Sequence, residues 1–290
     1  MELMKKFFPA TFGILVFFIL TCQAPAAPGL LQTASRAKFW CNDFPDTLLF
    51  LQNVYVYRSD EYADSTGKNI DINDTEVFLT LSRFIRPWHF GNRNQFQYIL
   101  EGILVYQNIH IEKDNRSDKD GIGDPIIYQS FGWNNASKTT HLTIALVSLF
   151  PLGDNELRGI GDDSIRIMPL FAWLQRIGSV WLEACVGYYH YFDERHHHNT
   201  YGKDYFEYNA IVSYHFNKWH VYLQGDYKDT RESKYRGVNM HDNGYNVALS
   251  AGLACSIGKN MELNLKYVQD VDGKDELQGQ GLNFRLAYFF

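Results

Sequence analysis

The sequence predicts an all-β fold: a transmembrane, antiparallel, up-and-down β-barrel of about twelve strands, preceded by a cleaved signal peptide. Three observations predict it. The N-terminus carries a short apolar segment of the kind found in exported proteins. Most of the remaining chain alternates apolar and polar residues with a period of two. The last strand keeps this alternation up to the aromatic residue Phe290.

The N-terminal segment has the three parts of a secretory signal. Lys5 and Lys6 precede an apolar run over residues 7–20, and the small residues Ala24 and Ala26 follow it. The run is shorter than the roughly 20 residues that a spanning helix needs. We therefore expect cleavage after Ala26. Use of Cys22 as a lipid acceptor is an open alternative.

The remaining chain has no Pro-rich or Ser-rich linker and reads as one domain. The expected organisation is a signal peptide over residues 1–26, a short periplasmic segment over 27–46 and a barrel over 47–290. On this reading Cys185 faces the lumen and Cys255 faces lipid, so these two cysteines would not pair.

The alternation defines the strands. Met261, Leu263, Leu265 and Tyr267, for example, form one row, and polar residues occupy the positions between them. Many segments are about nine to eleven residues long, the length that crosses a bilayer at a tilt, and aromatic residues gather near their ends. The predicted strands cover residues 47–57, 76–86, 95–109, 124–133, 140–150, 164–175, 180–192, 205–216, 219–229, 245–257, 261–269 and 281–290.

The connections between these segments fall into two kinds. Tight breaks occur at 217–218 and 258–260, whereas the connections at 112–120, 193–204 and 228–242 are long and charged. Outer-membrane barrels place short turns on the periplasmic side and long loops outside the cell. The sequence therefore predicts the short turns on the periplasmic side and the long, charged loops on the extracellular side.

The polar row of each strand is predicted to face the lumen and carries charges of both signs. These residues are candidates for the lining of a pore or for ion pairs that close it. They are Gln97, Glu101, Glu183, Glu207, Asn209, Gln224, Asp226, Glu262, Asn264, Lys266 and Arg285.

Two short motifs carry a resemblance to a known family. Gly121, Gly123 and Asp124 open one strand, and a later strand runs into Pro151 and Gly153. Together with the closing strand, these motifs resemble the outer-membrane barrels of the meta-pathway of phenol degradation. The resemblance implies an outer-membrane transporter of hydrophobic compounds.

The last strand also resembles the signal that the barrel-assembly machinery reads. Tyr288 and Phe290 stand at alternate positions at the end of an apolar row. An exposed strand of this kind can pair with the edge of another sheet. We therefore expect the assembly machinery and outer-membrane lipid to be partners of this chain.

Sites for metals and catalysis are weakly supported. His196, His197 and His198 are weak metal candidates, because adjacent residues in a strand point to opposite faces and share an ion only in an irregular loop. No metal or other cofactor is expected. Ser213 and His215 share a strand face, but no G-x-S-x-G motif accompanies them. We expect no enzymatic activity.

The expected function is passive uptake of small solutes, hydrophobic or aromatic ones among them, across the outer membrane of a Gram-negative cell. The net charge of −6 argues against a nucleic-acid partner. Two other classes remain open: a structural or surface-exposed barrel whose loops make contacts, and a barrel enzyme of the lipase type.

Overall fold

The computed structural model describes residues 46–111, 119–152, 165–192, 204–231, 234–235, 238–239 and 243–290. The predicted signal peptide, its Cys22 alternative, Gly153 and His196 to His198 lie outside these residues. Within them, no helix is long and apolar enough to cross a membrane.

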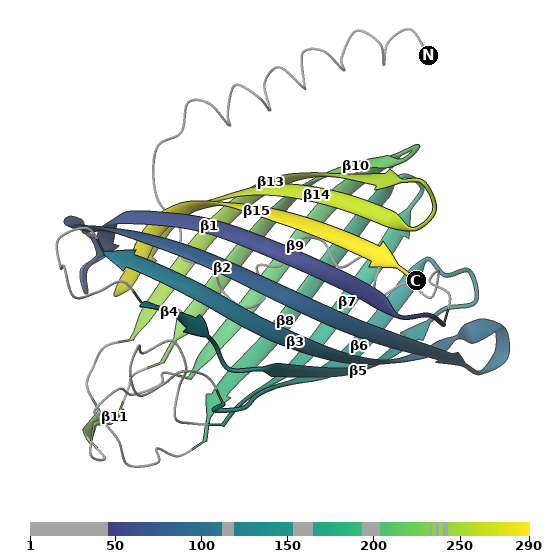
Figure 1. Cartoon of the computed structure of the whole chain (residues 1–290), viewed down its shortest axis with the longest axis horizontal. Coiled ribbons are helices and arrows are strands. Elements are labelled where there is room, and N and C mark those ends of the chain that lie inside the picture. Colours follow the sequence, from purple (N-terminus) through teal and green to yellow (C-terminus); the bar gives the residue numbers. More distant parts are fainter. Residues whose placement is uncertain are drawn as a thin grey trace, which may run out of the picture.

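The described chain forms a closed antiparallel barrel of twelve strands (Figure 1). Each barrel strand pairs with its neighbours along the chain, and β1 pairs with β15 to close the barrel. The barrel strands are β1 (Leu49–Ala63), β2 (Asn69–Phe90), β3 (Phe96–Ile111), β5 (Ile126–Asn134), β6 (Thr140–Leu149), β7 (Arg166–Ile177), β8 (Val180–Tyr191), β9 (Tyr205–Phe216), β10 (Trp219–Thr230), β13 (Gly244–Ile257), β14 (Met261–Lys274) and β15 (Glu276–Phe289). The fold class and all twelve predicted segments are confirmed.

Three short strands lie in the connections. β4 (Lys119–Ile122) pairs with the end of β3, while β11 (Lys234–Tyr235) and β12 (Val238–Asn239) pair with each other. A single 3-10 turn, η1 (Asn92–Asn94), follows β2. These elements leave the up-and-down order of the barrel unchanged.

The strands extend further than predicted at one end of the barrel. β2 starts at Asn69 rather than 76, β14 runs to Lys274 rather than 269, and β15 starts at Glu276 rather than 281. These added stretches are mostly polar, and only Ile70 and Ile72 alternate within them. Their backbone hydrogen bonds hold them in the sheet, as in the pairing of Ala63 with Asn69. The sequence pattern marks shorter strands because apolar residues are few in these stretches.

The two ends of the barrel differ in their connections. One, which we call the short-turn end, carries the turns at 91–95, 135–139, 178–179, 217–218 and 258–260. Two-residue turns fit here because Gly178 and Asn217 adopt positive φ values of 61° and 53°. Leu48 and Phe290 also lie at this end, where the Phe290 amide donates to the Leu48 carbonyl at 3.1 Å. The longer connections that follow β3, β6, β8 and β10 leave from the opposite end.

The outer surface of the barrel is apolar. Alternate residues of each strand are exposed, and many are large and hydrophobic; Val56, Leu104, Ile144, Leu223 and Leu265 are each at least half exposed. Aromatic side chains stack on one another near the strand ends, for example Phe90 on Phe96 at a centroid distance of 5.9 Å. A belt of this composition suits contact with lipid tails and interfaces.

Candidate functional site: the barrel lumen

All eleven predicted lumen residues lie on the inward face of the barrel. None is more than 8% exposed, and Lys266 and Arg285 are 0% and 1% exposed. The inward side chains are thus buried as completely as those of a soluble core. Cys185 is buried on the same face, and Cys255 lies on the outward face, so they form no disulfide with each other, as predicted.

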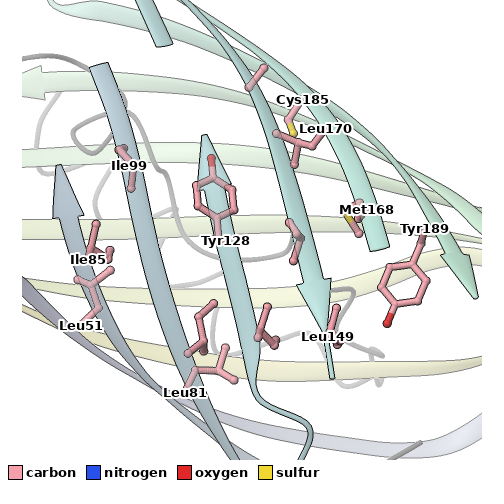
Figure 2. Packing of buried hydrophobic residues seen from close by; sticks show 14 of the residues in the cluster. Leu51, Leu81, Ile85, Ile99, Tyr128, Leu149, Met168, Leu170, Cys185 and Tyr189 are labelled. Atoms are coloured by element: carbon pink, nitrogen blue, oxygen red, sulfur yellow. The ribbon is translucent and has the colours of Figure 1, made fainter. Parts of the chain in front are cut away.

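The lumen has two unlike walls. Inward residues of β9, β10 and β13 to β15 are mostly polar, and we call them the polar wall: Glu207, Asn209, Ser213, Gln224, Asp226, Ser250, Glu262, Asn264, Lys266, Asn283 and Arg285. Inward residues of β1 to β3 and β5 to β7 are mostly apolar, and we call them the apolar wall: Leu49, Leu51, Leu81, Ile85, Ile99, Ile103, Ile126, Val147, Leu149, Met168 and Leu170. Figure 2 shows several of these apolar side chains projecting from neighbouring strands into one cluster.

The apolar wall was not predicted from the sequence. Its strands are apolar on both faces, so their sequences read as nearly continuous apolar runs, as over 142–149 and 167–174. Strands buried on both sides have this composition. The change from alternating segments late in the chain to continuous ones in its middle was the signal that could have identified the wall.

A buried ion pair lies within the apolar wall. Arg83 of β2 and Glu101 of β3 are 5% and 3% exposed, and the Arg83 Nε donates to a carboxylate oxygen of Glu101. Ile85 and Ile103 occupy the paired positions opposite them. Arg83 was missed in the sequence, because its partner becomes evident only when the register between β2 and β3 is known.

The polar wall is cross-linked by hydrogen bonds. The Asp226 carboxylate accepts from Asn209 Nδ2 at 2.5 Å and from Gln224 Nε2 at 2.9 Å. Arg285 donates to Glu262 at 3.0 Å. Lys266, on the same strand as Glu262, interacts electrostatically with Asp226. The charges predicted to face the lumen therefore balance one another in part within this wall.

A stack of flat side chains crosses four strands at the short-turn end. The Arg176 guanidinium lies 4.2 Å from the Trp181 ring centroid. Trp181 stacks on His215 at 3.8 Å, and His215 stacks on His220 at 4.7 Å. No sequence motif predicts this stack, because it joins residues of β7, β8, β9 and β10 through their register.

His215 of this stack lies beside Ser213, the serine that the sequence offered as its catalytic partner. Ser213 Oγ and His215 Nε2 lie 3.0 Å apart, so the fold does bring them together. Ser213 is 1% exposed and faces inward. A lipid ester approaching from the outer surface would not reach it.

Tyr222 crosses the lumen face of the neighbouring strand. Its hydroxyl donates to Asn264 Oδ1 at 2.9 Å, and its ring covers Gly252, where an added Cβ would overlap the ring atoms. We expect Gly252→Ala to displace Tyr222 and to lower the free energy of unfolding by about 1–3 kcal/mol. Denaturant unfolding of the detergent-solubilised barrel measures this change.

Gly102→Ala is the matched control for this substitution. Gly102 lies in a barrel strand, and an added Cβ would meet nothing within 4 Å. Alanine there is expected to preserve or slightly raise stability, because glycine in a strand is unfavourable by roughly 0.5–1 kcal/mol. Equal stability losses at both positions would contradict the contribution of Tyr222.

The motif residues lie where strands meet the longer connections. Gly121 lies in β4, and the Gly123 amide donates to the Val105 carbonyl at 3.0 Å. Asp124 is 4% exposed and pairs with Arg166 at the start of β7. Pro151 follows β6. The motif therefore joins the ends of several strands at this rim of the barrel.

The described residues contain no cluster of three or more histidine, cysteine or acidic side chains suited to a metal ion. His190, which precedes the histidine run, lies with its Nδ1 2.9 Å from the Asp204 carboxylate. Asp204 also accepts from the Tyr188 hydroxyl and the Tyr191 amide. These contacts hold Asp204 beside the end of β8.

Comparisons with solved structures agree with this architecture. The COG4313 outer membrane channel from Pseudomonas putida F1 superposes with a TM-score of 0.80 at 10% identity, covering 91% of this chain and 100% of that one. The β domain of the Bordetella autotransporter BrkA gives 0.56 at 11% identity, covering 84% and 100%. The CymD monoaromatic hydrocarbon channel gives 0.50 at 5% identity, covering 86% and 90%. At these identities the likeness concerns the fold.

No curated protein matches the chain in sequence. Residues 59–286 match the protein family described as "Putative MetA-pathway of phenol degradation". This range takes in all twelve barrel strands in whole or in part, together with both motifs noted above. The chain therefore belongs to this family.

Proposed function

We propose that the protein is an outer-membrane channel through which small solutes diffuse passively, hydrophobic and aromatic compounds among them. The observation that carries the proposal is the two-walled lumen. A continuous apolar surface inside a membrane barrel offers an apolar solute contacts that a wholly polar pore lacks. The opposite polar wall keeps hydrogen-bonding groups along the same path.

The location follows from the barrel itself. Closed barrels satisfy all strand hydrogen bonds within lipid, and single-chain barrels with an even number of strands are typical of bacterial outer membranes. The apolar outer belt and the unequal ends of the barrel support the same location. In this proposal the short-turn end is periplasmic, and outer-membrane lipid and the transported solute are the partners.

Passage through this lumen requires side chains to move. The predicted pore-lining residues are buried in this structure, and several are held by ion pairs or hydrogen bonds. We therefore expect small, discrete conductance steps in planar bilayers rather than the large currents of a wide, water-filled pore. Bilayers that receive protein-free detergent are the control, and a complete lack of conductance and solute flux would contradict the proposal.

The carboxylates of the lumen should set ion selectivity. Glu183 and Glu207 are buried on the inward faces of β8 and β9. Changing both to glutamine removes two negative charges from the path, so we expect the reversal potential under a salt gradient to shift towards anion preference. Glu76→Gln, on the exposed face of β2, is the matched control. An unchanged reversal potential in the double variant would assign Glu183 and Glu207 a structural role.

A further inference from the structure

Three buried asparagines gather on neighbouring strands of the lumen. Asn53 of β1, Asn264 of β14 and Asn283 of β15 are 0%, 1% and 0% exposed. Among the described residues, both side-chain polar atoms of Asn53, the Nδ2 of Asn264 and the Oδ1 of Asn283 have no hydrogen-bond partner. A buried polar atom without a partner loses its hydrogen bonds to water and gains none in return, so a group is expected to satisfy these atoms.

The register places these asparagines around one point. Asn53 and Asn264 are the direct neighbours of Arg285, on either side of it. Asn283 stands two residues earlier on the same strand, opposite Lys266. The unpartnered atoms therefore offer both donors and acceptors within one patch, which is what a hydroxyl or carbonyl group requires.

The charges beside the patch favour a neutral ligand. Arg285 is paired with Glu262 at 3.0 Å, and Lys266 interacts with Asp226 and Glu207. The two cations thus already face carboxylates, and an additional buried ion would lack a compensating charge. A neutral hydrogen-bonding group avoids this desolvation penalty.

The apolar wall adjoins the patch on one side. Asn53 pairs laterally with Leu81 of β2 and follows Leu51 on its own strand, both with side chains in the apolar cluster. A solute that contacts these leucines would bring a polar substituent within reach of Asn53. The site therefore fits a molecule with an apolar body and one polar end.

We propose that Asn53, Asn264 and Asn283 form a hydrogen-bonding subsite for neutral amphipathic solutes, namely apolar molecules that carry a hydroxyl or carbonyl group. This inference rests on the proposed channel function and specifies the class of solute that the lumen binds preferentially. A bare hydrocarbon of the same shape leaves the amide groups unsatisfied and binds less tightly.

Two probes of matched shape test the subsite. p-Cresol and p-xylene differ by a hydroxyl in place of a methyl group. Binding of each to the purified full-length barrel in detergent micelles is measured by ligand-observed NMR titration, with protein-free micelles as the baseline. We expect p-cresol to bind more tightly than p-xylene. In the Asn53→Ala/Asn264→Ala variant, p-cresol affinity should fall about tenfold, because two hydrogen-bonding amides are lost, while p-xylene affinity stays within about twofold.

Asn246→Ala is the matched control variant. Asn246 is also a buried inward asparagine with an unpartnered Nδ2 among the described residues, but it lies near the start of β13, outside the patch. This variant should bind both probes as the parent does. Heat-modifiable electrophoretic mobility checks that each variant is folded.

Three outcomes would overturn the subsite: equal affinity of the parent for both probes, unchanged p-cresol affinity in the double variant, or no saturable p-cresol binding, as expected if the amides hold water alone. Failure of the channel function is a separate result, because it is read from bilayer conductance of the parent protein. If the barrel conducts but binds p-cresol no more tightly than p-xylene, the channel proposal stands and the subsite proposal fails.

Discussion

Replacing Arg83 with leucine is expected to lower the free energy of unfolding by about 3–5 kcal/mol. The substitution leaves the Glu101 carboxylate buried in the apolar wall without its guanidinium partner. Ile85 and Ile103, which stand opposite the pair in the register, are apolar and offer no replacement. Guanidinium-induced unfolding of the barrel in detergent micelles measures the loss, followed by tryptophan fluorescence.

Two further variants test whether the loss of stability comes from leaving one buried charge without its partner. Arg83→Leu/Glu101→Leu removes both charges and should recover most of the stability, because apolar groups of similar size can replace a buried ion pair. Arg58→Leu breaks the pair with Asp74 near the rim, where the Arg58 side chain is 54% exposed, and should cost far less stability than Arg83→Leu because water screens the exposed pair. The interpretation fails if Arg83→Leu costs no more than Arg58→Leu, or if the double variant is as unstable as the single one.

The barrel could be predicted because one physical constraint repeats along the chain. A strand between lipid and a polar lumen must alternate, and segments such as 205–216 and 261–267 do so. The strand ends could not be predicted as well, because Asn69 and Lys274 lie in mostly polar stretches with too few apolar residues to mark a strand. Backbone pairing alone keeps them in the sheet.

The charged residues of the lumen were predictable, but their contacts were not. Alternation placed Glu101, Lys266 and Arg285 inward, and the structure has them on that face. It did not predict that Arg83 pairs with Glu101, because that contact depends on the register between two strands. The stack of Trp181 on His215 depends on register in the same way.

The apolar wall was missed for a different reason. The prediction assumed that an inward row is polar, as in a water-filled pore, whereas Ile99 and Leu170 belong to an inward apolar cluster. On this side of the barrel the inward and outward rows are both apolar, so their periodicity carries little information about direction. Only the closed sheet identifies which row faces the lumen.

Removing Phe290 is expected to reduce the amount of assembled barrel in the outer membrane several-fold. Tyr288 and Phe290 point outward at the end of the strand that closes the barrel, with an edge-to-face centroid distance of 5.0 Å. An open strand edge with this outward aromatic row is what we expect the assembly machinery to pair with before closure. The measurement is the heat-modifiable fraction of the protein in isolated outer membranes.

The structure predicts that this loss arises during assembly and not from a weaker barrel. Phe290 lies beyond the last residue of β15, contacts Leu48 and Thr47 through its backbone, and is 64% exposed. Its removal therefore breaks few native contacts, and refolding of the truncated chain into detergent should proceed close to the parent yield. Phe290→Tyr keeps an aromatic end and should assemble normally in cells. A truncated chain that assembles as well as the parent in cells would rule out Phe290 as part of the assembly signal, whereas poor refolding in detergent would assign the loss to folding itself.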